Sequence, residues 1–163
     1  MQYSKATFEN KIIKPSDLVL RIDEIKKNSP VVFTNGCFDI LHRGHVTYLA
    51  QARALGKSMI VALNTDESVK RQGKGVDRPI NNLDNRLAVI ASLESVSYVT
   101  YFDADTPLEL ILLIQPEILV KGGDWKIPDI VGSSEVLANG GEVHSIPFLF
   151  ATSTTAMINK IRQ

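Results

Sequence analysis

The sequence has little cysteine and no long hydrophobic run, and each shortage excludes a class of protein. Cys37 is the one cysteine among 163 residues, so an intramolecular disulfide and a zinc site built from CxxC pairs are both excluded. No apolar run approaches the roughly 20 residues that a membrane-spanning helix needs, and residues 1–10 contain no signal-peptide core. We therefore expect a cytoplasmic protein that does not act at a membrane.

An excess of charge of one sign is also missing. The chain has 18 Lys and Arg against 18 Asp and Glu, whereas dedicated nucleic-acid-binding proteins usually carry a basic excess. We therefore expect no nucleic-acid partner. The balance is uneven, however, because residues 42–86 hold eight Lys and Arg against four Asp and Glu. A local excess of positive charge suits a small, highly charged ligand.

Short apolar segments alternate along the chain with amphipathic ones. The apolar segments predict five buried strands, at 31–34, 58–63, 98–102, 118–120 and 142–146. The amphipathic segments predict helices at 16–28, 45–55, 66–71, 83–93, 106–115, 133–139 and 153–162. We expect Ser16 and Thr106 to be the N-caps of the two helices that they begin. This alternation is typical of an α/β, Rossmann-like, doubly wound parallel sheet with helices on both faces.

The length is that of about one domain of roughly 150 residues. We expect a single domain over residues 1–163, with a helical lead-in at 1–29 and the core at 30–163. Doubly wound sheets bind ligands beyond the carboxyl ends of their strands. The loops where ligands are expected therefore lie at 34–44, 64–82, 121–124 and 147–155.

The phosphate-binding motifs GxxxxGK[ST] and GxGxxG are both absent. Instead, the first of these loops contains His42-Arg43-Gly44-His45 at the start of a predicted helix. A helix N-terminus offers free N–H groups and a positive dipole end to an anion. Gly44 would let a phosphate approach the backbone, and His42 and His45 could donate hydrogen bonds to it. A histidine pair alone is more often structural, but this pair lies where the fold predicts a ligand.

The segment His42-Arg43-Gly44-His45 resembles the HxGH signature of the nucleotidyltransferase superfamily, and Thr152-Ser153-Thr154-Thr155 resembles the Ser-Thr element of that superfamily. Further segments resemble the adenylyltransferase half of the bifunctional ADP-heptose synthases and, equally, the stand-alone heptose 1-phosphate adenylyltransferases. These segments lie at 63–69, 78–79, 85–86, 119–124 and 140–143. The resemblance covers about residues 30–162, without the sugar-kinase half.

The resemblance implies a cytidylyltransferase-like fold and a reaction. AMP would pass from ATP to D-glycero-D-manno-heptose 1-phosphate, giving ADP-heptose and pyrophosphate for the inner core of lipopolysaccharide. Mg²⁺ would bridge the phosphates rather than occupy a protein site, so no metal ligand is expected. Related enzymes are often dimers, so a homodimer stays open beside a monomer.

The resemblance also implies roles for single residues. His42 and His45 would act at the α-phosphate and the departing pyrophosphate, and Lys74 would contact a phosphate from a glycine-rich loop. The nucleotide is expected against Thr34, Asn35, Gly36, Cys37, Phe38, Gly44, Arg86, Lys121, Gly123, Asp124, Ser153, Thr154 and Thr155. The sugar phosphate is expected against Asp39, Arg43, Asp66 and Arg78.

Structural roles are alternatives for several of these residues. Lys74 would then be a solvated loop lysine, Arg86 an exposed helix arginine, and Ser153 the cap of the last helix. A charged residue such as Lys121 at the end of a buried strand seldom lacks a partner, which would be a ligand phosphate or Asp124.

One departure bears on the nucleotide. The glycerol-phosphate cytidylyltransferases carry an arginine five residues before the Ser-Thr-Thr, and that position is Phe148 here. The lost donor argues against CTP, so a cytidylyltransferase acting on glycerol phosphate or another polyol phosphate is the alternative function. A catalytically silent nucleotide-binding module would have no need of the full histidine pair, and a flavodoxin-like docking domain would explain neither motif.

Overall fold

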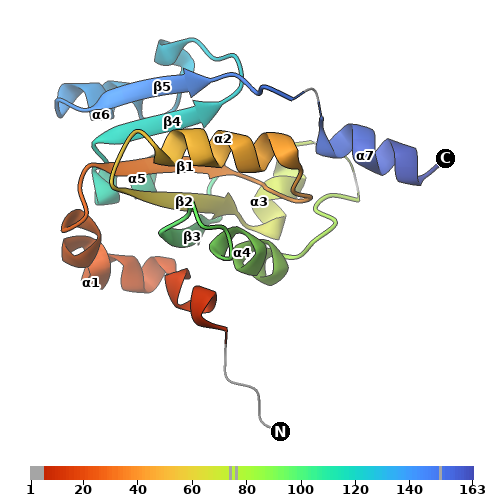
Figure 1. Cartoon of the computed structure of the whole chain (residues 1–163), viewed down its shortest axis with the longest axis horizontal. Helices are drawn as coiled ribbons and strands as arrows, with labels where there is room; N and C mark the ends of the chain where they lie inside the picture. The colour runs from red at the N-terminus through yellow and green to blue at the C-terminus, as the bar shows by residue number, and fades with distance from the viewer. Residues whose placement is uncertain (1–5, 74, 76, 151) are drawn as a thin grey trace, which may run out of the picture.

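The computed structural model describes residues 6–73, 75, 77–150 and 152–163. Five parallel strands form one sheet within them, in the order β3-β2-β1-β4-β5 (Figure 1). The strands are β1 Val31–Gly36, β2 Ser58–Asn64, β3 Tyr98–Phe102, β4 Ile118–Gly122 and β5 Glu142–Ile146. The predicted Rossmann-like sheet is confirmed. Three strands run one or two residues further than predicted, because parallel partners such as Leu63 opposite Gly36 continue the hydrogen-bonded ladder past the apolar run.

In the described residues, seven α-helices and two 3₁₀ turns precede, connect or follow these strands. The helices are α1 Pro15–Lys26, α2 Arg43–Arg53, α3 Asp66–Arg71, α4 Leu83–Ala91, α5 Leu108–Ile114, α6 Ser133–Ala138 and α7 Thr154–Ile161. The turns, η1 Thr7–Lys11 and η2 Ile127–Asp129, were not predicted. Helix α2 begins two residues before its predicted start, so Gly44 and His45 lie in its first turn.

Two predicted N-caps, Ser16 and Thr106, are wrong, and each stands next to a proline. Ser16 lies inside α1, because Pro15 takes the first helical position, where its missing N–H costs nothing, and Lys14 is the N-cap. At α5 the N-cap is Pro107 itself, so Thr106 lies outside the helix. The predicted start of the last helix is confirmed, since Ser153 Oγ accepts a hydrogen bond from Ala156 N.

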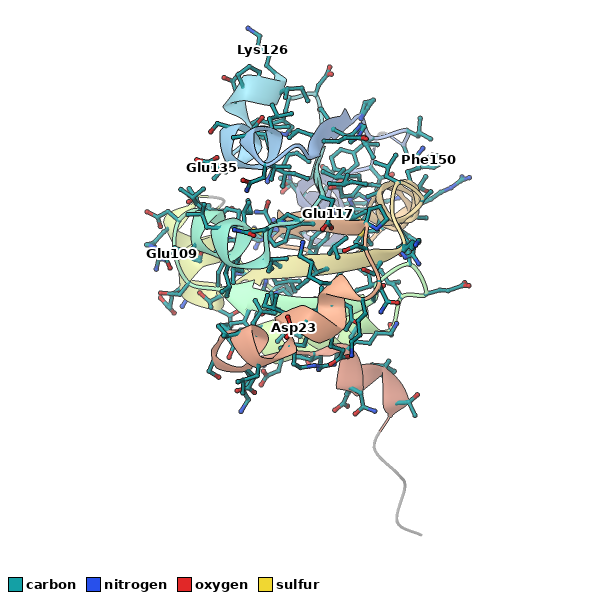
Figure 2. The ribbon with its side chains drawn as sticks, turned by 90° about the vertical axis from the view of Figure 1, so that its left-hand side faces the viewer. Asp23, Glu109, Glu117, Lys126, Glu135 and Phe150 are labelled. Atoms are coloured by element: carbon teal, nitrogen blue, oxygen red, sulfur yellow. The ribbon has the colours of Figure 1, made fainter. Side chains whose placement is uncertain are left out.

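The alternation of side chains along the strands divides the core into two layers. Val31 and Phe33 of β1 face the layer that α1, α5 and α6 complete, while Val32 faces the layer of α2 and α4. Successive side chains of a strand point to opposite faces, so a continuous apolar run is buried on both. Helices accordingly cover both faces of the sheet (Figures 1 and 2).

The chain reverses its direction across the sheet between β1 and β4. Strands β1, β2 and β3 follow one another toward one edge, and β4 and β5 then continue on the other side of β1. The loops after β1 and β4 therefore leave in opposite directions and open a crevice at their carboxyl ends. Helix α7 lies at this end of the sheet, at the right of Figure 1.

Glu117 connects three segments at the amino-terminal end of the sheet, the end that faces the viewer in Figure 2. Its carboxylate accepts hydrogen bonds from Lys26 Nζ at 2.8 Å and from Val31 N at 2.7 Å, joining α1, β1 and the start of β4. Burial opposes ionisation of Glu117, but these hydrogen bonds outweigh it and lower the pKa of the carboxyl. Across the described part of the chain, no helix has the length and apolar character needed to cross a membrane.

Candidate active site

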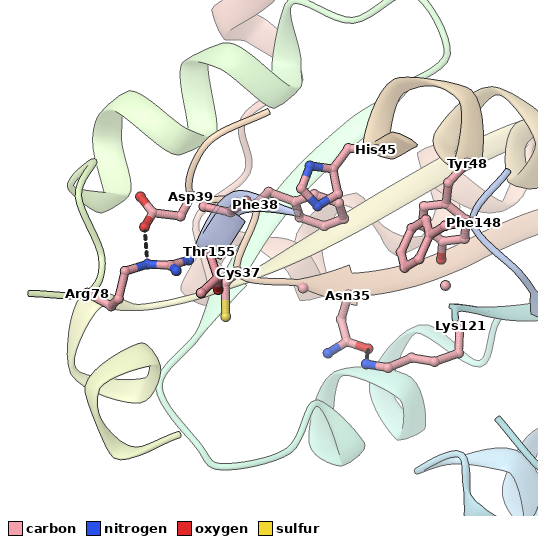
Figure 3. Close-up of a pocket in the computed structure, with 13 residues that line it drawn as sticks. Asn35, Cys37, Phe38, Asp39, His45, Tyr48, Arg78, Lys121, Phe148 and Thr155 are labelled. Carbon is pink, nitrogen blue, oxygen red and sulfur yellow. Dashed lines mark hydrogen bonds and ion pairs between the residues drawn. The ribbon is translucent and has the colours of Figure 1, made fainter. Parts of the chain in front are cut away.

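A cavity of about 290 Å³ opens at the carboxyl ends of β1 and β4, and it is called the histidine cavity below (Figure 3). Its walls come from the loop after β1, from α2, from the end of β4 and from the start of α7. The predicted site residues that line it are Asn35, Gly36, Cys37, Phe38, Asp39, His45, Arg78, Lys121, Thr154 and Thr155. The chain thus brings together residues more than a hundred positions apart at the point where the topology reverses.

His42 and His45 stand at the N-terminus of α2 with their rings stacked. The ring centroids lie 3.9 Å apart at an interplanar angle of 24°. His42 is the N-cap of α2 without a side-chain capping bond, and its Nδ1 is buried without a hydrogen-bond partner in the described structure. Burial lowers the pKa of His42, so the ligand-free ring is neutral at pH 7. A neutral imidazole next to free helix N–H groups can accept a proton when an anion arrives.

Aromatic rings hold His45 at the cavity wall. Its ring makes edge contacts with Phe38 and Phe148, with centroids 5.5 and 6.3 Å away. Phe148 also contacts Tyr48, one helical turn after His45 on α2. Such packing limits the motion of the imidazole and keeps its position relative to the cavity.

Gly44 allows the close packing of this helix start. A Cβ at Gly44 would lie 3.0 Å from the His42 ring and 3.5 Å from the carbonyl oxygen of Phe150. Contacts at 3.0 Å are tighter than side chains normally make, so any larger residue would displace His42. Glycine here serves the position of the histidine as well as the predicted approach of a phosphate.

Lys121 and Arg78 place two cationic groups on the cavity. Lys121 Nζ donates to Asn35 Oδ1 at 3.3 Å and lies 5.8 Å from the centroid of the Trp125 ring. Arg78 Nε donates to Asp39 Oδ2 at 2.6 Å, and both side chains are almost fully buried. Lys74, the third predicted cation, lies outside the described residues.

Asp39 has partners within the protein, and its contact with a sugar hydroxyl stays a prediction. Its side chain is 0% exposed, and its carboxylate accepts from Arg78 and from the backbone N–H groups of Ile80 and Asn81 at 2.6–2.9 Å. A carboxylate so enclosed has its hydrogen-bonding capacity taken up by the 78–81 loop. Asp39 therefore orients Arg78 and this loop in the structure.

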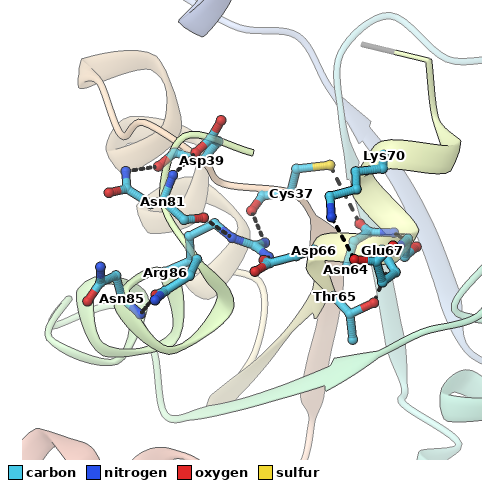
Figure 4. A network of polar contacts seen from close by, with 12 residues as sticks. Cys37, Asp39, Asn64, Thr65, Asp66, Glu67, Lys70, Asn81, Asn85 and Arg86 are labelled. Carbon is cyan, nitrogen blue, oxygen red and sulfur yellow. Dashed lines mark hydrogen bonds and ion pairs between the residues drawn. The ribbon is translucent and has the colours of Figure 1, made fainter. Parts of the chain in front are cut away.

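Arg86 is buried, so the alternative of an exposed helix arginine is wrong, while its contact with the nucleotide stays a prediction (Figure 4). Its side chain is 0% exposed and donates to Cys37 O at 2.8 Å, to Asn81 O at 3.0 Å and to Asp66 Oδ1 at 2.6 Å. The planar guanidinium, with its several fixed donors, suits this bridging of three segments. Asp66, predicted to contact the sugar, is one-third exposed and ends this network.

The start of α7 contributes hydroxyl groups. Thr155 lines the cavity and is exposed, while Thr154 Oγ1 donates to Ile40 O at 3.0 Å and so binds α7 to the loop after β1. Ser153 caps the helix, the structural role that its sequence position also allowed. Arg43 is exposed at the start of α2 and stacks 3.7 Å from the centroid of the Phe150 ring, without lining the cavity.

Other predicted residues lie beside the cavity without lining it. Thr34 is fully buried, and its hydroxyl shares a 2.5 Å hydrogen bond with Tyr48. Gly123 has φ +114°, which favours glycine, and its N–H donates to Ile146 O, while Asp124 is exposed. Cys37, by contrast, does line the cavity, and its buried thiol lies 3.2 Å from Gln72 Oε1, as a packing residue would.

Three residues of this wall had no predicted site role, namely Tyr48, Gly122 and Phe148. Tyr48 lies three residues after His45 on α2, a spacing that places both on one helix face, and this could have identified it. Burial raises the pKa of Tyr48, so it remains a neutral hydroxyl that also donates to Val120 O. Gly122 leaves room for the Phe148 ring, because a Cβ at this position would lie 2.8 Å from that ring.

The assembled groups can bind and neutralise a polyanion of small size. Imidazole, ammonium and guanidinium groups lie near the N-termini of α2 and α7. Among the described residues, no three His, Cys, Asp or Glu side chains gather as a metal site. With Asp39 occupied by Arg78, the donor set fits an anion, and a magnesium ion would fit here as part of a nucleotide substrate.

Comparison with known proteins identifies the family. The cytidylyltransferase-like family model matches residues 33–157, which contain both helix N-termini of the histidine cavity. The chain belongs to the cytidylyltransferase-like family.

Relatives in the cytidylyltransferase-like family match most of this chain. The "D-beta-D-heptose 1-phosphate adenylyltransferase" of Bordetella bronchiseptica is 51% identical over 98% of this chain and 99% of that protein. The "Bifunctional protein HldE" of a Marinomonas species is 52% identical over 91% of this chain, which covers only 31% of that longer protein.

One solved structure agrees with this membership, and a second shares the fold. The crystal structure of a "lipopolysaccharide core biosynthesis protein" from Thermoplasma volcanium matches with a TM-score of 0.61 and 27% identity, over 75% of this chain and 98% of that one. Pantothenate synthetase from Thermus thermophilus shares the fold, with a TM-score of 0.56 at 16% identity over 84% of this chain and 61% of that one.

Proposed function

We propose that this protein transfers the AMP group of ATP to the phosphate of D-glycero-β-D-manno-heptose 1-phosphate and releases pyrophosphate. The observation that carries the proposal is the histidine cavity, in a chain 51% identical over nearly its whole length to a protein named for this reaction. The name of that relative supports the β anomer. Such an enzyme would act in the cytoplasm, and the Thermoplasma structure's title supports a place in lipopolysaccharide core synthesis.

The reaction needs no general base. A phosphate oxygen of the sugar, already anionic at neutral pH, attacks the α-phosphorus of MgATP. The new P–O bond forms as the bond from the α-phosphorus to the bridging oxygen breaks, and the electron pair leaves with pyrophosphate. Catalysis therefore rests on positioning and on stabilising the charge that moves to the leaving group.

The chain supplies groups suited to each part of this work. His45 and His42 at the start of α2 would donate hydrogen bonds to the α-phosphate and to the bridging oxygen. The hydroxyl of Thr155 and the N-terminus of α7 would hold the β- and γ-phosphates. Lys121, near the carboxyl end of β4, would neutralise charge between the α-phosphate of ATP and the phosphate of the sugar.

A pyrophosphate-release assay with the purified protein tests the proposal. Wild-type protein with MgATP and the β-anomer should release pyrophosphate well above the blank without sugar, and the α-anomer should react more slowly. Release with CTP and glycerol phosphate but not with ATP would instead establish the polyol-phosphate cytidylyltransferase. ATP binding without release for any acceptor would leave a nucleotide-binding module and reject the enzyme.

A further inference from the structure

A second cavity, of about 140 Å³, adjoins the histidine cavity on the other side of Asn35 and Lys121. Both residues line both cavities, and Lys121 Nζ lies 3.3 Å from Asn35 Oδ1. Figure 3 draws this contact as a dashed line in its view of the histidine cavity. The second cavity is called the tryptophan pocket here. Its other polar and aromatic walls include Asn64, Gln72, Asp105, Thr106, Trp125 and Asp129.

The two cavities share Lys121 but differ in most of their other charged groups. Histidine, arginine and the N-termini of two helices surround the first, whereas the carboxylates of Asp105 and Asp129 line the second. Arg71 Nε donates to Asp105 at 2.9 Å, but the Asp129 side chain has no polar partner within the described chain. Carboxylates repel a triphosphate and accept hydrogen bonds from hydroxyl groups, so the tryptophan pocket disfavours ATP and favours a polyol.

Trp125 adds an apolar wall that suits one face of a sugar. Half of this residue is exposed, and its position is fixed because its backbone N–H donates to Ser145 Oγ and its ring N–H to Gly122 O. A sugar ring presents C–H groups on its faces and hydroxyls around its edge. An ordered aromatic face can pack against the C–H groups, and the amide and carboxylate groups can form hydrogen bonds with the hydroxyls.

We infer that the tryptophan pocket binds the sugar of the acceptor, with Trp125 against the ring and Asp129 accepting hydrogen bonds from its hydroxyls. The phosphate of the acceptor then lies at Asn35 and Lys121, where the two cavities meet and the α-phosphate would be. This inference rests on the proposed function, and it makes Trp125 and Asp129 determinants of sugar specificity rather than catalytic residues.

Steady-state kinetics of two variants test the assignment. Asp129→Asn and Trp125→Ala should each raise KM for the heptose 1-phosphate by about tenfold, the effect of losing one good polar or apolar contact, with kcat and KM for ATP nearly unchanged. Glu94→Gln, at an exposed position outside both cavities, is the matched control and should alter neither KM. An unchanged sugar KM in both variants, with wild-type turnover intact, would overturn this inference alone.

Intrinsic fluorescence gives a second readout that needs no turnover. Trp125 is the single tryptophan of the chain, so its emission reports on this pocket and on the adjoining Lys121, 5.8 Å from its ring centroid. Heptose 1-phosphate titrated without ATP should change the emission, and Asp129→Asn should shift the titration to about tenfold higher concentration. A saturable, Asp129-dependent change in a protein that shows no turnover would support the pocket and reject the proposed function. Absence of any saturable change in the wild type would overturn the pocket assignment.

Discussion

Arg86 Nη2 donates a 2.6 Å hydrogen bond to Asp66 Oδ1 and so joins α4 to the first turn of α3. The same guanidinium binds the carbonyl oxygens of Cys37 and Asn81. Arg86 thereby connects the loop after β1, which carries the histidine motif, with the segment that carries Arg78. Its influence on the site passes through the positions of these loops.

Arg86→Ala should reduce stability more than it alters nucleotide affinity. Removing the guanidinium takes a donor from one buried and one partly buried carbonyl, which should lower the free energy of unfolding by about 2–4 kcal/mol. Urea unfolding checks this, with Arg21→Ala, from an exposed pair with Glu24, as a control that should change stability much less. A variant with wild-type stability and a raised KM for ATP would instead make Arg86 a nucleotide contact.

His45→Ala and His42→Ala should each reduce turnover by about 10²–10³-fold, the usual effect of losing one preorganised donor. Thermal unfolding should show both variants folded. His144→Ala is the matched control, because His144 lies in β5 beside Glu142 and does not line the cavity. Equal activity of the His144 and His45 variants would contradict the proposed role of the pair.

ATP binding should raise the pKa of His42, which burial lowers in the ligand-free protein. The phosphates favour the imidazolium, so the complex takes up a proton in the interval between the two pKa values. ATP affinity should therefore rise as the pH falls through this interval. Calorimetry in two buffers of different ionisation enthalpy measures the proton uptake. The uptake should fall in His42→Gln, and an equal uptake in that variant would assign the proton elsewhere.

Gly44→Ala should separate stability from activity. Alanine is the better helix former, so α2 should keep its stability, but the added Cβ would press on the His42 ring at 3.0 Å. We expect an unchanged or higher unfolding temperature together with lower turnover. An equally active Gly44→Ala would show that the stacked position of His42 is not needed for the reaction.

Glu117→Gln should weaken the amino-terminal end of the sheet. The loss of charge at the Lys26 and Val31 contacts should lower the free energy of unfolding at pH 7 by about 1 kcal/mol, given the partial exposure of the carboxylate. Because the folded-state pKa lies below the ordinary 4.5, this contribution is present above pH 4.5 and disappears as the pH falls through the folded value. The wild type and the variant should therefore converge in urea unfolding at low pH. The exposed Glu24→Gln is the control and should show a much smaller difference at pH 7.

Local patterns in the sequence were enough to predict the sheet and the loops that line the histidine cavity. Apolar runs of β-branched residues are buried wherever they fold, so all five strands were predicted within two residues at each end. The position of His42 and His45 at a helix start follows from neighbouring residues as well. The predictions were weaker at helix ends such as Ser16 and Thr106, where an adjacent proline decides the first turn.

The sequence by itself determined the alternation of strands and helices, the loops that meet at the switch point, and the histidine pair at the start of α2. Only the tertiary structure decided that Asp39 and Arg86 bind partners as far as 42 and 49 residues away, and that Asn35 and Lys121 separate two cavities. The physical reason is the range of the interactions. Periodicity and capping act between neighbours along the chain, whereas a buried charge takes whichever partner the fold brings within about 3 Å.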